Sequence, residues 1–340
     1  MNFSLIKMEP MQDNPRSNPM PRLGLTHGDI NGISYEIILK AFADAQMLNL
    51  LTPVLYGQSK VFSYYKKNFG MVDFGYSLTR DARQAWAQKF NIINIVDREL
   101  KIDPGQLNSL SAEMSVMSVK MSVEDLHKGY LDALVMTPAC LSVERTQVEY
   151  MASVFGRPDL LRVLVSDFMR LALATDDMPL REALGIIDTA FIVRKLETLS
   201  NALKTDFGLN APKIAVMGIN PHASEAGTGA DNDKVVQAIT EAQKRGIYAF
   251  GPFSPSRLFV TGAWKKYDAA LAMTYEQGVV PFKLLSINGG AYYWAGLPAV
   301  CTAPLHGPGF DMANANQASP DALRKAIYLA MDIVKQKKEA

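Results

Sequence analysis

Three of the four histidines in this sequence lie in polar, glycine-containing stretches that follow short apolar runs: His27, His222 and His306. Imidazole suits metal ions such as zinc, and ligands of open α/β sheets bind in loops at the carboxyl ends of strands. These stretches are therefore where chemistry is expected. Such loops occur in every α/β protein, so the three together are a stronger signal than any one. His127 lies in a helix-like pattern and is expected at the surface.

The first of these stretches, residues 26–36, carries glycines where a backbone turns sharply or approaches a ligand. It has neither the GxGxxG spacing of a dinucleotide-binding turn nor the GK[ST] ending of a phosphate-binding loop. Neither of those nucleotide fingerprints applies.

Apolar runs alternate with stretches in which apolar residues recur every three to four positions, a pattern typical of parallel strands joined by helices. The expected strands are residues 21–26, 52–57, 91–96, 132–137, 213–219 and 298–303. The clearest helices are residues 33–45, 111–131, 188–208 and 233–246. The sequence predicts a mainly parallel α/β fold.

Composition narrows the class of partner. The chain has 340 residues and a formal net charge of +1, so no overall field favours nucleic acid or an anionic membrane, and a small-molecule ligand is expected. Its two cysteines, Cys140 and Cys301, are far apart, which argues against a disulfide scaffold or a zinc ribbon and favours the cytoplasm. Residues 1–20 predict a flexible arm rather than a secretory signal. No apolar run reaches the roughly 18–20 residues that cross a bilayer.

Several motifs, in one order along the chain, resemble those of the 4-hydroxythreonine-4-phosphate dehydrogenase (PdxA) family. Residues 26–36 are similar to its T-x-G-D-x-x-G-I-G-x-E signature, with Ser34 in place of the last common glycine. The others are residues 149–152, 218–223 (GINPHA), 272–278 (AMTYEQG), 295–298 (AGLP) and 302–307 (TAPLHG). The resemblance covers residues 21 to 337.

This resemblance implies an isopropylmalate-dehydrogenase-like fold with two α/β/α lobes around an active-site cleft. Residues 21–135 and 305–340 would form the first lobe, and residues 136–304 the second. It also implies a homodimer that uses NAD and a divalent metal to oxidise and decarboxylate 4-phosphohydroxy-L-threonine, a phosphorylated amino-acid-like substrate, in pyridoxal phosphate (vitamin B6) biosynthesis.

The metal positions depart from the family pattern. Where the family has three histidines, this chain has Asp177, His222 and Tyr275. A neutral phenol is a poor ligand because its pKa is near 10. Asp177 and His222, with help from Glu276, could still hold zinc, magnesium or manganese. The alternative is that they are polar cleft residues without a metal.

The substrate positions have changed as well. The resemblance places Gln147, Val148, Tyr292 and Cys301 at substrate-binding positions, where the family has more polar residues. Lys283 is kept as a substrate-binding residue, and it is also the main catalytic candidate together with Glu276. Residues Gly296, Leu297 and Pro298 are the cofactor-binding candidates.

Two interpretations of these replacements stay open. Either the pocket is remodelled for a different ligand, or it has collapsed around its own side chains because unpaired polar groups are costly to bury. The first predicts a working dehydrogenase, with the family substrate or an altered one. The second predicts a catalytically impaired paralogue with a binding or regulatory role.

Overall fold

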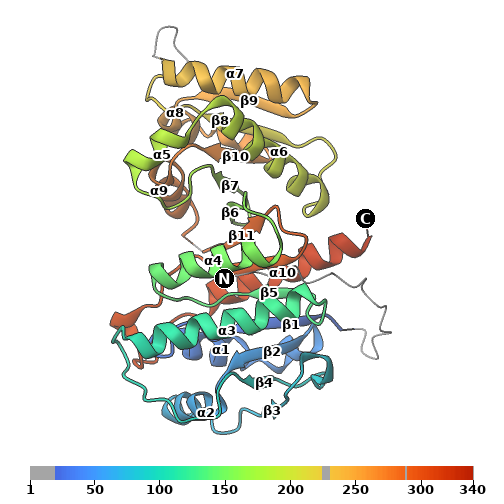
Figure 1. The fold of residues 1–340 in the computed structure, drawn as a ribbon, viewed down its shortest axis with the longest axis vertical. Coiled ribbons are helices and arrows are strands. Elements are labelled where there is room, and N and C mark those ends of the chain that lie inside the picture. The colour runs from blue at the N-terminus through green and yellow to red at the C-terminus, as the bar shows by residue number, and fades with distance from the viewer. Residues whose placement is uncertain (1–19, 224–229, 288, 340) are drawn as a thin grey trace, which may run out of the picture.

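A single twelve-stranded sheet runs through the molecule in the order β3-β4-β2-β1-β5-β12-β11-β6-β7-β10-β8-β9 (Figure 1). The computed structural model describes residues 20–223, 230–287 and 289–339, so the predicted arm lies outside the described residues except for Met20. The α/β fold predicted from the sequence is confirmed.

One half of the sheet consists of parallel strands only. These are β1 (Arg22–Thr26), β2 (Thr52–Gly57), β3 (Ser77–Leu78), β4 (Asn91–Asn94), β5 (Ala133–Val135) and β12 (Val300–Pro304). Every residue of β1, β2, β5 and β12 is buried, as expected for parallel strands covered by helices on both faces.

The far half is also parallel and contains β7 (Arg170–Leu173), β8 (Lys213–Met217), β9 (Tyr248–Phe253) and β10 (Ala269–Ala272). Between the halves, β11 (Ala291–Ala295) pairs antiparallel with β12 and with β6 (Leu161–Val165), and β6 pairs antiparallel with β7. These three reversals make the parallel strands of the two halves run in opposite directions. Their carboxyl ends therefore lie at opposite edges of the sheet.

All six strands expected from the sequence are present, but β3, β6, β7, β9, β10 and β11 were not predicted. The hairpin of β6 and β7 looks like one long apolar run interrupted by Asp167 and Arg170. The structure turns the chain at this interruption, and Arg170 begins the returning strand.

The helices are α1 (Ser34–Ala41), α2 (Ser59–Asn68), α3 (Ser109–His127), α4 (Leu141–Val154), α5 (Leu180–Ile186), α6 (Thr189–Thr205), α7 (Ala230–Lys244), α8 (Pro255–Val260), α9 (Tyr275–Leu285) and α10 (Asp321–Glu339). Helix α3 packs on β1, β2 and β5 and also against α4, whereas α10 packs on β12, β5 and β11. Figure 1 shows α4 and α10 at the narrow middle of the molecule, between the two ends. Among the described residues, no helix is both long and apolar enough to cross a membrane.

Candidate functional site

A buried arginine lies at the centre of the sheet. Arg162, on β6, has only 6% of its side chain exposed. Its guanidinium carbon lies 5.1 Å from the ring centre of Tyr292 and 5.8 Å from that of Trp294, both on the neighbouring strand β11. The strand register places Trp294 directly opposite Arg162. Attraction between a cation and an aromatic face is strongest away from water, so strand pairing itself holds this charge in place.

The acidic partner of Arg162 comes from the loop after β7. Asp176 Oδ1 lies 3.1 Å from Arg162 Nε. Asp176 has a φ of +52°, a left-handed conformation in which aspartate is enriched. Burial raises the pKa of Asp176, and Arg162 opposes that rise. The next residue, Asp177, is held by α4, because its carbonyl oxygen accepts a 2.8 Å hydrogen bond from Arg145 Nη2.

A cavity of 20 Å³ lies beside Arg162. Its wall includes Thr137 after β5, the two aromatic rings of β11 and three residues of α4, namely Glu144, Gln147 and Val148. A water molecule needs at least about 10–15 Å³ measured in this way, so the cavity has room for one oxygen-sized group. Burial raises the pKa of Glu144, which favours its neutral form.

Polar atoms without a hydrogen-bond partner are concentrated at this cavity. Within the described part of the chain, three such buried atoms belong to its wall, Gln147 Nε2, Arg162 Nε and Trp294 Nε1, and two more, Asp176 Oδ1 and Asp177 Oδ2, belong to the aspartates that act on Arg162. The contact between Arg162 and Asp176 is close but is not an aligned hydrogen bond. Buried polar groups are nearly always paired, so this concentration points to a ligand site.

Helix α9 carries a second cation, Lys283, whose charge acts on His306 in the cavity wall. The pKa of His306 is lowered mainly by burial and to a smaller extent by the Lys283 ammonium. His306 lines the cavity and also a groove of 1220 Å³ along α10. Its Nδ1 donates to the Gly307 carbonyl oxygen at 3.0 Å, which leaves Nε2 of the neutral ring able to accept a proton.

The family model described as "Pyridoxal phosphate biosynthetic protein PdxA" matches residues 49–330. The chain belongs to the PdxA family. It is 34% identical to the 4-hydroxythreonine-4-phosphate dehydrogenase of Bacteroides thetaiotaomicron, covering 93% of this chain and 89% of that protein. It is 29% identical to a protein of Cutibacterium acnes named for D-threonate 4-phosphate dehydrogenase activity, covering 93% and 94%. The crystal structure of a 4-hydroxythreonine-4-phosphate dehydrogenase from Burkholderia phymatum matches with a TM-score of 0.75 at 25% identity, covering 93% and 99%.

The described residues do not fit the metal that the PdxA resemblance implies. Asp177 is held by Arg145, and burial raises the pKa of Tyr275, which keeps its phenol neutral. His222 is exposed in the turn that precedes residues 224–229, which lie outside the described part. Over residues 20–223, 230–287 and 289–339, no three His, Cys, Asp or Glu side chains are grouped to hold a metal ion. The Arg162 charge, which acts on Asp177 and Tyr275, further disfavours a dication.

The substrate positions are brought together only in part. Gln147, Val148 and Tyr292 line the cavity. Cys301 does not, because it is fully buried on β12 in an apolar cluster, and burial raises the pKa of its thiol. Glu276 lies exposed in the first turn of α9.

The cofactor positions border a different recess. Gly296, Leu297 and Pro298 form the turn after β11 and line a recess of 410 Å³ together with residues of α6. None of its lining residues is shared with the Arg162 cavity. His306, by contrast, connects the cavity to the larger groove along α10.

Arg162, His306, Trp294 and Glu144 line the site, and the sequence assigned none of them a role. His306 was noted as a loop histidine only. Arg162 belongs to no motif, and its one signal is a charge inside the apolar run LRVLV, where a buried strand is otherwise expected to be uncharged.

Proposed function

We propose that this chain is a cytoplasmic, nicotinamide-dependent dehydrogenase that oxidises the secondary alcohol of a small phosphorylated hydroxy acid at the Arg162 cavity. The first candidate substrate is 4-phosphohydroxy-L-threonine, whose β-keto acid product would lose carbon dioxide on the route to pyridoxal phosphate. The observation that carries the proposal is that residues at substrate-binding positions of the family lie together at one cavity. Gln147, Val148 and Tyr292 line one cavity, and the charge of Lys283 acts on His306 in its wall.

Lys283 and Glu276 have separate roles in this proposal. The Lys283 ammonium, exposed on α9, binds the phosphate or carboxylate of the substrate as it enters from solvent. Glu276 lies two turns earlier on the same helix and is exposed, so it can return a proton to bulk water. Between them and the cavity, His306 Nε2 can accept the proton of the substrate alcohol.

The groove along α10 is the better fit for a dinucleotide. Its 1220 Å³ exceeds the roughly 300–1,000 Å³ usual for a small-ligand pocket, and it shares His306 with the cavity. The Gly296–Pro298 recess of 410 Å³ remains the site that the family motif favours. When bound, the nicotinamide supplies the hydride acceptor.

A homodimer is part of the proposal. Large apolar side chains are exposed on two helices, α5 and α9, which appear close together in the view of Figure 1. They are Leu180 (62%), Leu184 (45%), Val280 (48%), Leu284 (70%) and Leu285 (40%). Exposed apolar side chains that gather on a surface mark interaction sites, and a second copy of the chain is the expected partner.

The second candidate function is that of a catalytically impaired paralogue that binds a ligand or regulates another protein. The size of the cavity favours it, because 20 Å³ admits one oxygen-sized group and not a whole substrate. Catalysis therefore requires that the cavity opens when the substrate binds.

Absorbance of the reduced cofactor discriminates between the two. The purified protein is mixed with NAD or NADP and with 4-phosphohydroxy-L-threonine or D-threonate 4-phosphate, once with a chelator and once with zinc, magnesium or manganese. We expect turnover, and we expect Lys283→Met to lower kcat/KM by about 10- to 150-fold, the effect of losing one charge-assisted hydrogen bond. Lys266→Met, an exposed lysine of the same half, is the matched control and should leave kcat/KM unchanged. No turnover with either substrate under any condition would favour the impaired paralogue.

A further inference from the structure

Three hydrogen-bond donors from three different elements meet at the Arg162 cavity. Gln147 Nε2 comes from α4, Arg162 Nε from β6 and Trp294 Nε1 from β11, and all three residues line the cavity. Gln147 Nε2 and Trp294 Nε1 have no acceptor, whereas Arg162 Nε lies 3.1 Å from Asp176 Oδ1 without an aligned hydrogen bond. Unsatisfied buried donors are costly, so the two unpaired donors and the arginine beside them favour a bound acceptor.

The charge at the cavity suits an anionic acceptor. The Arg162 guanidinium is always protonated, and it is held between Asp176 and the rings of Tyr292 and Trp294. Asp176, with 34% of its side chain exposed, and Asp177 both act on Arg162, but neither lies in the cavity wall. Glu144 is the acidic residue of the wall itself, and burial raises the pKa of its carboxyl.

We infer that the Arg162 cavity is a metal-free oxyanion site, which takes one carboxylate oxygen of a small hydroxy acid between Gln147, Arg162 and Trp294. This inference rests on the proposed function. The volume of 20 Å³ accommodates one oxygen atom of the ligand, and the rest of the molecule needs the cavity to open at His306, which also lines the groove along α10. Arg162 acts on Asp177 and Tyr275, the side chains at the metal-ligand positions of the family. The arginine therefore supplies the positive charge that a metal supplies in the family.

The indole N–H resonance of Trp294 reports directly on this site. The chain has three tryptophans, so a ¹⁵N-labelled sample gives three indole signals, and Trp294→Phe identifies the relevant one. The probe is glycolate, the smallest hydroxy acid, titrated in chelator-treated buffer without nicotinamide. We expect a saturable downfield shift of the Trp294 signal, while the exposed Trp86 stays unchanged.

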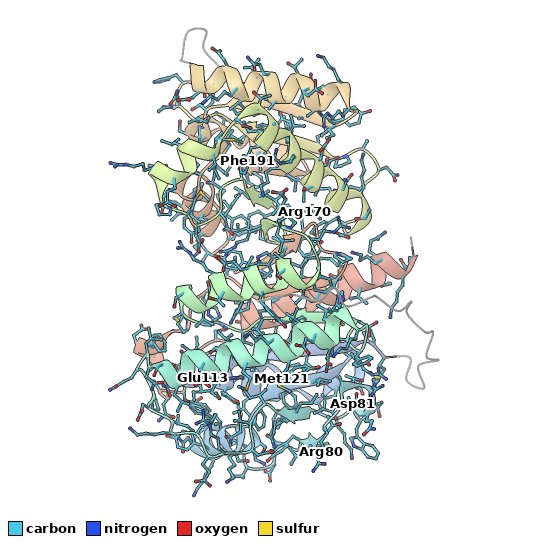
Figure 2. All side chains as sticks on the ribbon, in the orientation of Figure 1. Arg80, Asp81, Glu113, Met121, Arg170 and Phe191 are labelled. Atoms are coloured by element: carbon cyan, nitrogen blue, oxygen red, sulfur yellow. The ribbon has the colours of Figure 1, made fainter. Side chains whose placement is uncertain are left out.

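Two variants separate this site from general ionic effects. Arg162→Met should weaken glycolate binding at least tenfold, because a charge-assisted hydrogen bond is lost. Arg170→Met is the matched control. Arg170 begins the adjacent strand β7, stacks 4.7 Å from the Phe207 ring and is labelled in Figure 2 near the narrow middle of the molecule, but it does not line the cavity. Its removal should leave the shift intact. If Arg162→Met does not fold, Gln147→Leu serves as the test, with the same expected direction.

Zinc-binding measurements test whether the Arg162 charge takes the place of a metal ion. We expect Asp177→His with Tyr275→His to bind no stoichiometric zinc while Arg162 is present, and to bind it once Arg162→Met is added. The inference is overturned if glycolate leaves the Trp294 signal in place, if Arg170→Met abolishes the shift as fully as Arg162→Met, or if the wild-type protein or the two-histidine variant binds stoichiometric zinc. Because the titration contains no cofactor and follows no turnover, its failure is distinguishable from failure of the dehydrogenase proposal.

Discussion

The loop after β1 and the Arg162 cavity both bury polar side chains, but they differ in how far those side chains find hydrogen-bond partners within the protein. In the loop, residues 26–36, Asp29 accepts from Asn31 N at 2.8 Å and from Ser111 Oγ at 3.0 Å. Asn31 donates to the Gln106 carbonyl oxygen at 2.9 Å and accepts from Asp103 N at 2.8 Å. At the cavity, by contrast, Gln147 and Trp294 are buried with donors unpaired.

The difference separates structural polarity from ligand-binding polarity. The loop keeps the family motif almost unchanged and pairs Asp29 and Asn31 within the protein, so these two side chains fix the backbone between α3 and the sheet. The cavity has lost the family residues and has not become apolar, as a site without a ligand would tend to do. Sequence motifs therefore locate both regions. Their roles are distinguished only by which buried polar atoms have hydrogen-bond partners within the protein.

The largest expected effect comes from breaking the loop. Gly28 has a φ of +62°, and an added Cβ would lie 2.3 Å from Ser34 Oγ and 2.4 Å from the Pro138 carbonyl oxygen. Gly28→Ala combines backbone strain with a clash against backbone, so we expect the free energy of unfolding in urea to fall by about 4 kcal/mol or more. Gly75→Ala is the control, because nothing lies within 4 Å of its added Cβ. An equal loss in the free energy of unfolding for the two substitutions would contradict the conclusion that the loop is rigid and closely packed.

The fold could be predicted further than the site. Strands buried on both faces, such as β1 and β2, are continuous apolar runs and are recognisable as such. Strand β6 is not, because Arg162 interrupts it, and only the opposing Trp294 and Tyr292 explain how a cation is tolerated there. Family positions predicted that Gln147, Val148 and Tyr292 share a pocket. They could not show that Arg162 lies among them, because that depends on the antiparallel pairing of β6 with β11, two strands that were not predicted.

The loop also contains buried atoms without a hydrogen-bond partner, Glu36 Oε2 and His27 Nδ1, and the histidine gives a pH test. His27 Nε2 donates to the Met114 carbonyl oxygen at 3.0 Å, while its buried Nδ1 has no partner. Burial lowers the pKa of His27 from 6.5 to about 4. The native state therefore binds this proton less readily than the unfolded state. The contribution of His27 to stability is complete above pH 6.5 and declines as the pH falls toward 4, by roughly 3 kcal/mol in all.

Urea unfolding between pH 7 and 4 measures that decline, and the comparison is with His27→Gln, whose profile should be flatter by the same roughly 3 kcal/mol. His127→Gln, at an exposed position at the end of α3, should leave the wild-type profile unchanged. Parallel profiles for wild type and His27→Gln would show that the buried imidazole is not the group being titrated.

The smallest expected changes in stability come from replacing a buried amide side chain by leucine, once in the loop and once at the cavity. Asn31→Leu removes an amide whose two ends are paired, which strands the Asp103 N–H and the Gln106 carbonyl oxygen, so we expect a loss of about 2 kcal/mol in the free energy of unfolding. Gln147→Leu removes an amide whose nitrogen is unpaired and only 3% of whose side chain is exposed. It should therefore be neutral, or stabilise the ligand-free protein by up to about 1 kcal/mol. Opposite signs would establish that the cavity, unlike the loop, holds its polar groups for a ligand at a cost in stability. A loss for Gln147→Leu as large as that for Asn31→Leu would mean that its amide is already satisfied within the protein.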